Sequence, residues 1–175
     1  KKKIEKIQFI QNKSLELSIF LSLPATFALL ISSEQITSAL FGYGSFDYTS
    51  VINSGKALFY FSFGLPAFAL IKVFSSYIFA RQNTQTPFIF SVYSVIINIF
   101  ISVYFFSDFG FIIIPIATTI SSWFNAILLF GYLIKKNYFT FDKSLNFSLL
   151  KILISSILTS FLFYQLINYF DYLLV

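Results

Sequence analysis

The stretch GLPAFALIKV, residues 64–73, places a proline and then a lysine inside one of the most apolar parts of this 175-residue chain. Pro66 removes a backbone donor and Gly64 lets the backbone bend, so a helix over this stretch is predicted to kink. Lys72 carries a charge into the same helix. A break and a charge within an apolar helix are expected where the helix lines a polar cavity or meets a partner inside a membrane.

The composition indicates an integral membrane protein. Hydrophobic residues make up 57% of the chain, charged residues only 11%, and the mean hydropathy is +0.80. Cys and His are both absent from the sequence, which excludes disulfides, thiol or imidazole catalysis and most metal sites. Every Asp and Glu lies in a terminus, a loop or the end of an apolar run, so we expect neither an enzyme nor a bound cofactor.

Five apolar runs are long enough to cross a bilayer as helices, and none alternates as a barrel strand would. We therefore predict an all-α integral membrane protein with five transmembrane helices. The chain does not begin with Met and has an odd number of spans, so we expect residues 1–175 to be part of a longer protein. The predicted spans cover residues 15–33, 57–80, 87–107, 111–134 and 149–170.

Local signals mark the ends of these spans. Thr84 or Thr86 is the expected N-cap of the third span, with Pro87 at its first helical position. The sequence SDFG, which contains Asp108 and Gly110, predicts a tight turn and makes the third and fourth spans an antiparallel pair.

The basic residues suggest an orientation. They gather before the first span and at every second connection, and residues 35–56 are expected to be a short external connection. The connections in between hold Glu34, Asp47 and Asp108, with Lys56 as their only cation. The positive-inside rule then puts the N-terminus in the cytoplasm and the C-terminus outside. The cations lie at the ends of apolar runs and form no continuous patch, so no nucleic-acid partner is expected.

Lys72 is the main candidate for a functional charge. It lies nine residues before Arg81, roughly 13 Å inside the span at the helical rise of 1.5 Å per residue. The alternative is a lysine that only pairs with carbonyls in the helix bundle. Pro24 and Pro115 are further kink candidates beside Gly64 and Pro66, although each can also be a packing kink without a substrate nearby.

A second polar group lies on the third and fourth spans. Helical spacing puts its members on one face of each span, and their amide and hydroxyl oxygens suit a monovalent cation or a polar substrate group. They equally suit plain hydrogen bonds between helices. The members are Asn98, Ser102, Thr118, Ser122 and Asn125. Of these, Asn98 and Asn125 are cavity candidates, while Asn98, Ser102 and Thr118 are the candidate cation site.

Several elements together resemble the MurJ/MviN family of lipid II flippases. They are LSLPATFALLISSEQITSALFGYGSFD in the first half, GLPAFALIKVFSSYIFARQNTQTP in the middle, and SDFGFIIIPIATTISSWFNAILLFGYLIKK further on. The resemblance covers nearly the whole chain. It implies helices nine to thirteen of a two-lobed, roughly fourteen-helix exporter fold, so that the N-terminal lobe is a partner absent from this sequence.

The family resemblance implies a function and its partners. The expected activity is translocation of lipid II, the undecaprenyl-pyrophosphate-linked peptidoglycan precursor, across the inner membrane by alternating access. Bilayer lipids surround such a protein, and the energy source is Na⁺ or the membrane potential. In this sequence Ser102 replaces an acidic ligand of the family's sodium site. Alternative functions are a related polysaccharide-lipid flippase, a MATE-like drug exporter, or a membrane scaffold without transport.

Overall fold

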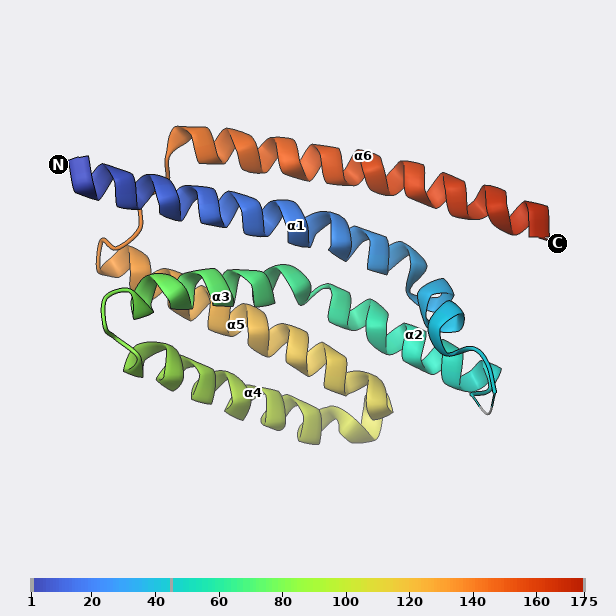
Figure 1. The fold of residues 1–175 in the computed structure, drawn as a ribbon. Coiled ribbons are helices and arrows are strands. Elements are labelled where there is room, and N and C mark those ends of the chain that lie inside the picture. Colours follow the sequence, from blue (N-terminus) through green and yellow to red (C-terminus); the bar gives the residue numbers. More distant parts are fainter. Residues whose placement is uncertain (1, 45, 175) are drawn as a thin grey trace.

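The computed structural model describes residues 2–44 and 46–174 as an all-helical bundle (Figure 1). Its helices pack side by side in an elongated arrangement, with α6 along one edge and α4 along the other. The elements in chain order are α1 (Lys2–Phe41), α2 (Tyr48–Ser62), α3 (Leu65–Phe79), α4 (Gln85–Phe109), the 3₁₀ turn η1 (Gly110–Ile112), α5 (Ile113–Lys135) and α6 (Lys143–Leu174). The predicted fold class is confirmed.

Three helical stretches of the described residues are long and apolar enough to cross a membrane, and the bent pair α2 and α3 makes a fourth. One of the three, Gln85–Lys135, contains both α4 and α5. The chain reverses at η1, so these helices of 25 and 23 residues run antiparallel and each has the length of one crossing. The apolar helices therefore correspond in order to the five predicted spans.

The connection predicted over residues 35–56 is wrong. Helix α1 continues to Phe41 and α2 already begins at Tyr48, where Asp47 caps it by accepting a hydrogen bond from the Ser50 N–H at 2.8 Å. Only a short segment around residues 42–47 connects the two helices. Glu34 lies within α1 and Lys56 within α2, and both side chains are exposed. Charged residues are tolerated in a helix where they lie at the surface, so these two charges do not indicate where the helices end.

The start of α4 also differs from the prediction. The helix begins at Gln85, so Pro87 is its third residue and not its first. Thr84 occupies the N-cap position, as predicted, but its side chain makes no cap hydrogen bond. Instead, Asn83 Oδ1 accepts from the backbone N–H of Thr86 at 3.1 Å, because an amide one residue earlier reaches the free donors of the first turn.

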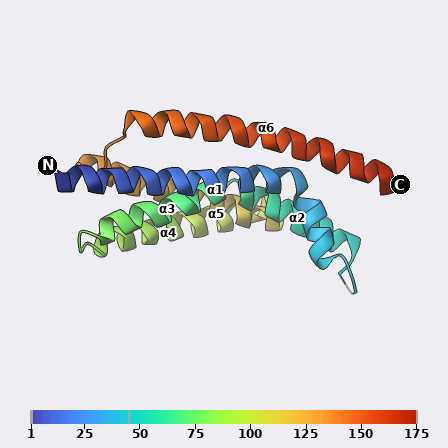
Figure 2. The ribbon, with the colours of Figure 1, turned by 45° about the horizontal axis from the view of Figure 1, so that its top comes forward.

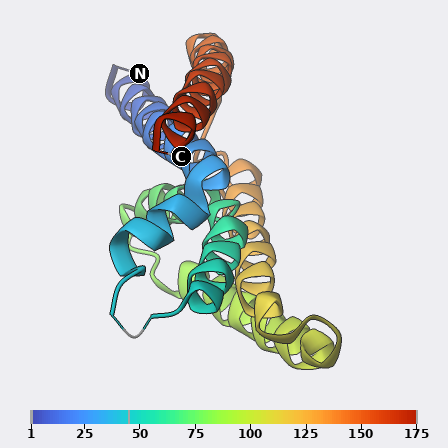
Figure 3. The same cartoon turned by 90° about the vertical axis from the view of Figure 1, so that its right-hand side faces the viewer.

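The first and last helices form a parallel pair, with α6 packed along α1, its main neighbour (Figure 2). An end-on view shows α4 and α6 on opposite sides of the bundle (Figure 3). Helix α5 contacts α2, α3 and α4, and α1 contacts α2, α3 and α6. Helices α1 and α5 are thus the two elements that hold the bundle together.

The buried core lies at the end of the bundle where α1 begins and α5 ends. We call this the basic end, since Lys6, Arg81, Lys135 and Lys136 lie there. The side chains of the core come from α1, α3, α5, α6 and the α5–α6 linker, and aromatic rings contribute to it. Its buried members are Leu15, Phe74, Tyr77, Ile78, Leu129, Leu133, Phe139 and Leu145.

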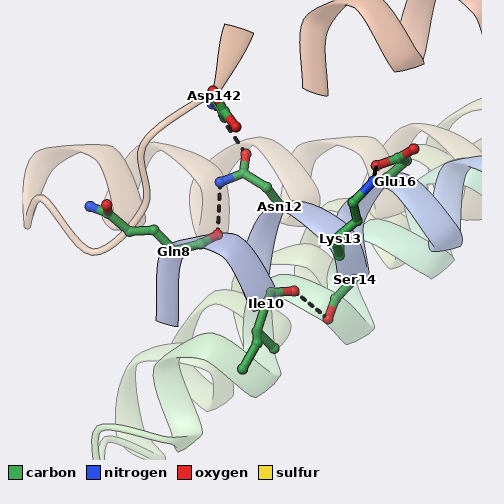
Figure 4. Close-up of polar contacts among 7 residues, drawn as sticks. All are labelled: Gln8, Ile10, Asn12, Lys13, Ser14, Glu16 and Asp142. Carbon is green, nitrogen blue, oxygen red and sulfur yellow. Dashed lines mark hydrogen bonds and ion pairs between the residues drawn. The ribbon is translucent and has the colours of Figure 1, made fainter. Parts of the chain in front are cut away.

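Polar contacts fix the α5–α6 linker against this core. Arg81 donates to the carbonyl oxygens of Tyr77 at 2.7 Å and Tyr138 at 3.0 Å, and its guanidinium lies 4.1 Å from the centre of the Tyr138 ring. On the other side of the linker, Asn12 donates to the carbonyl oxygen of Thr140 and accepts from the backbone N–H of Asp142 (Figure 4). Non-helical backbone at the basic end is therefore held from both sides.

Candidate functional site

The apolar helix over residues 57–80 is broken near its middle. Helix α2 ends at Ser62, α3 begins at Leu65, and their axes differ by 43°. Gly64 is the N-cap of α3 and Pro66 is its second residue, a position where a missing N–H is tolerated. The kink candidates Gly64 and Pro66 thus lie at the break itself.

Breaking a helix leaves carbonyl oxygens without their usual donors. At this break, the Gly64 N–H bonds to the carbonyl of Phe61 and not to that of Tyr60. The Tyr60 carbonyl instead accepts from Thr119 Oγ1 at 2.9 Å, and the Phe63 carbonyl accepts from Trp123 Nε1 at 3.0 Å. Both donors lie four residues apart on one face of α5, so a neighbouring helix satisfies the broken one.

Gly64 allows this close approach. A Cβ atom at this position would lie 3.2 Å from Thr119 Oγ1, 3.2 Å from the Phe61 carbonyl oxygen and 3.1 Å from the Phe68 ring. The glycine is buried, and its φ of −83° is ordinary. The requirement for glycine here is therefore one of space between α3 and α5, and not one of backbone conformation.

The other two kink candidates lie in different settings. Helix α1 is helical around Pro24, and its backbone leaves helical angles at Ser32, where φ is −126°. There the Ser32 hydroxyl donates to the carbonyl of Ala28 at 2.7 Å, which gives that oxygen a local partner. Pro115 is buried in the first turn of α5, where a missing N–H interrupts no hydrogen bond of the helix interior.

The two Leu-Pro-Ala segments lie at the same level of the bundle. Helices α1 and α3 run antiparallel, with the Tyr77 hydroxyl donating to the carbonyl of Gln11 near one end. At the other end α2 comes so close to α1 that a Cβ on Gly55 would lie 3.0 Å from the Cα of Glu34. The register between these contacts places residues 23–25 alongside residues 65–67.

Lys72 lies on α3, eight residues after Gly64, with an exposed side chain. Among the residues that the structure describes, no carboxylate pairs with it. It lines an open groove of about 720 Å³ between α3 and the start of α4. Hydroxyl and amide groups share this groove with apolar side chains, and its polar members besides Lys72 are Ser75, Ser76, Thr84, Gln85 and Ser91.

Asn98 and Thr118 meet between α4 and α5. Asn98 Nδ2 donates to Thr118 Oγ1 at 3.0 Å and to Ser121 Oγ at 3.3 Å. One turn away, the hydroxyl of Ser94 donates to the carbonyl of Ser121. These contacts are hydrogen bonds between antiparallel helices, the second of the two roles that the sequence allowed.

Ser102 and Asn125 lie at opposite ends of the same interface. The Ser102 hydroxyl and the Asn125 Oδ1 are buried and have no hydrogen-bond partner within the described chain. Asn125 Nδ2 lies 3.5 Å from Ser91 Oγ, at the edge of the Lys72 groove. As a cation site, Asn98, Ser102 and Thr118 supply only neutral oxygens, and the Thr118 hydroxyl already donates to the carbonyl of Ile114.

Sequence reasoning named the face of α5 that points to α4 and missed the face that points to the break. Thr119 and Trp123 were not among its candidates, although both bind the broken helix. One signal was available. A predicted break near Pro66 requires donors from elsewhere, and Trp123 is the single tryptophan of the chain.

Comparisons with known proteins agree on one family. The family model described as lipid II flippase MurJ matches residues 1–175. A probable lipid II flippase MurJ of Rhizobium meliloti is 40% identical over 133 residues, which cover 76% of this chain and 25% of that protein. Its counterpart in Rickettsia prowazekii is 31% identical over 174 residues, covering 96% of this chain and 34% of that protein.

A solved structure shows the same fold. Lipid II flippase MurJ in an inward closed conformation superposes with a TM-score of 0.80 over 92% of this chain and 33% of that structure, at 24% sequence identity. The chain thus spans between a quarter and about a third of the length of the proteins it matches. On the match across all of its residues, this chain belongs to the lipid II flippase MurJ family.

Proposed function

We propose that the full-length protein moves lipid II from the inner to the outer leaflet of the bacterial inner membrane by alternating access. The observation that carries this proposal is the family match over all 175 residues. The fold supports it, because apolar helices with a break in one of them are typical of transporters. Transport of this kind requires no covalent chemistry, so the protein acts as a flippase and not as an enzyme.

We further propose that the groove of Lys72 forms part of the wall of the substrate cavity. Lys72 is the charged residue of α3, it lies beyond a helix break, and it has no carboxylate partner among the described residues. A phosphate-bearing headgroup would gain a charge-assisted hydrogen bond from its ammonium group. Asn125, at the edge of the same groove, would contribute polar contacts. The remaining wall would come from the N-terminal lobe.

The proposed orientation places the basic end in the cytoplasm. Cations gather there from the start of α1, from Arg81 in the turn after α3 and from the end of α5, and cytoplasmic connections of membrane proteins carry such an excess of Lys and Arg. Helix α6 runs parallel to α1, so its far end would be external. Bilayer lipids would cover the apolar outer faces of α4 and α6, which are largely exposed in the described chain.

For the energy source, the arrangement of Asn98, Ser102 and Thr118 favours the membrane potential over bound Na⁺. The three residues bring no formal negative charge, and Thr118 is engaged with Asn98. Flipping by the purified full-length protein in vesicles should therefore depend on an imposed potential and persist when K⁺ replaces Na⁺. Loss of activity on that replacement would contradict the proposal.

The test of the flippase proposal is rescue of cells depleted of their own lipid II flippase by the full-length gene. The wild-type protein should restore growth, Lys72→Ala should fail, and Lys72→Arg should restore growth partly because it keeps the charge. Lys136→Ala, which removes an exposed lysine beyond the end of α5, is the matched control.

Two outcomes would count against the proposal in different ways. Growth with Lys72→Ala at the wild-type rate would remove the role assigned to Lys72 and leave the flippase proposal intact. Failure of the wild-type gene, with expression and membrane insertion confirmed, would point to a different lipid-linked precursor.

A further inference from the structure

We infer that Thr119 and Trp123 of α5 are positioning residues for Lys72, because they hold the break between α2 and α3 and so set where α3 points. This inference rests on the proposed role of Lys72 in transport. The role that it gives to α5 is separate from the hydrogen bonds that α5 makes to α4.

The contacts at the break carry the inference. Thr119 bonds to the last turn of α2 through the Tyr60 carbonyl, and Trp123 bonds to the residue that follows α2 through the Phe63 carbonyl. A third freed carbonyl, that of Phe59, accepts from the hydroxyl of Ser62 within α2 itself. Of these three side-chain caps, the two from α5 are the ones that tie the break to another helix.

The position of Gly64 shows that α5 is fitted to the break. A single methyl group on Gly64 would crowd Thr119 Oγ1 at 3.2 Å. The hydroxyl therefore occupies the space that a side chain at position 64 would need. Apolar surroundings leave few other donors for the two carbonyls, since water is excluded from the hydrocarbon core.

The consequence for Lys72 follows from helix geometry. Helix α3 is anchored at its far end, where Tyr77 bonds to Gln11 and Ile78 is fully buried. The contacts of Thr119 and Trp123 hold the last turn of α2 and Phe63, the residue directly before the N-cap Gly64 from which α3 starts. Lys72 lies five residues from the anchored Tyr77, a lever of about 7.5 Å, so each change of about 10° in helix direction moves it by about 1.3 Å.

The experiment uses the full-length protein with other cysteines removed and spin labels on exposed residues at the two ends of the broken helix, Thr49 in α2 and Phe79 in α3. Double electron–electron resonance then measures the distance between the two spin labels. The test variant is Thr119→Val combined with Trp123→Phe, which keeps shape and removes both donors. Straightening the 43° bend would lengthen this distance by roughly 3 Å over 30 residues.

Two control variants separate the contacts from general damage. Thr119→Ser keeps a hydroxyl at the break and should give the wild-type distance distribution. Ser122→Ala removes a neighbouring hydroxyl that bonds within α5, to the carbonyl of Thr118, and should also leave the distribution unchanged. We expect the double variant to broaden the distribution toward longer distances and to fail in the growth rescue, as Lys72→Ala does.

The outcomes distinguish this inference from the proposed function. An unchanged distance distribution in the double variant would overturn the inference, whatever the growth. A broadened distribution with full growth, while Lys72→Ala fails, would also overturn it, because Lys72 would then work without the contacts. Full growth with Lys72→Ala would instead overturn the link to transport, and the distance result would still report whether α5 holds the break.

Discussion

The basic end and the break between α2 and α3 both contain backbone outside regular helix, and they hold it in different ways. At the basic end the α5–α6 linker is fixed by Arg81, by Asn12 and by a buried core in which the rings of Tyr77 and Phe139 stack with centres 6.0 Å apart. At the break the freed carbonyls are satisfied by three separate side-chain hydrogen bonds, two of them from α5, and Gly64 leaves the space for that close approach.

This difference indicates separate roles for the two regions. Many overlapping contacts make the basic end costly to rearrange, since losing one leaves the others in place. Two hydrogen bonds between membrane helices stabilise the break by only about 1–4 kcal/mol together, a range in which conformations can interconvert. The comparison predicts a fixed basic end and a break whose geometry can change during transport.

The largest loss of stability should follow Arg81→Ala. This substitution removes two charge-assisted hydrogen bonds and the contact with the Tyr138 ring, so we expect the free energy of unfolding to fall by about 2–4 kcal/mol. Arg81→Lys should be intermediate, because an ammonium group cannot span both carbonyls as the planar guanidinium does. Thermal unfolding of the purified full-length protein is the measurement. A melting temperature equal to that of wild type would show that the basic end does not depend on Arg81.

A smaller loss is expected for Asn12→Ala. The side chain bonds to the linker through Thr140 and Asp142, and removing it should cost about 1–2 kcal/mol. Limited proteolysis should then cut the linker faster than in the wild type. Gln8→Ala is the matched control, because Gln8 contributes only its backbone carbonyl, which accepts from Asn12 and remains in the variant (Figure 4). Equal cutting rates for the two variants would show that the hydrogen bonds of Asn12 do not protect the linker from proteolysis.

The smallest stability change, below about 1 kcal/mol, is expected for Gly64→Ala. The smaller conformational entropy that Ala gives the unfolded chain offsets the crowding of Thr119 and Phe68, which must shift by a few tenths of an ångström. The bend angle should nevertheless change, and the distance between labels at Thr49 and Phe79 measures it. A stability loss as large as that of Arg81→Ala would contradict the comparison, since the break would then be as firmly built as the basic end.

The order of the five apolar spans follows from the sequence, with α2 and α3 together forming the second, because long apolar runs have few alternatives in a bilayer. The break at Gly64 follows as well, since a proline and a glycine two residues apart cannot continue a regular helix. The turn around Gly110 was equally readable, and that residue has a φ of +59°, which favours glycine.

The contacts between residues far apart in the chain could not be predicted from the sequence. Thr119 and Trp123 are 59 and 60 residues away from their acceptors, and nothing in the local sequence gives the rotation of α5 that brings them there. The kink of α1 at Ser32 was missed for a similar reason. Serine changes helix geometry through a hydrogen bond to the preceding turn, and the pattern of apolar residues does not reveal it.

The contacts at the break also bear on biosynthesis. Helices α2 and α3 leave the ribosome before α5, and at about 5–20 residues per second the 59 residues between Tyr60 and Thr119 take roughly 3–12 s to synthesise. During that interval the carbonyls at the break have no partner from α5. The nascent chain must therefore keep this segment hydrated or shielded by the insertion machinery until α5 arrives.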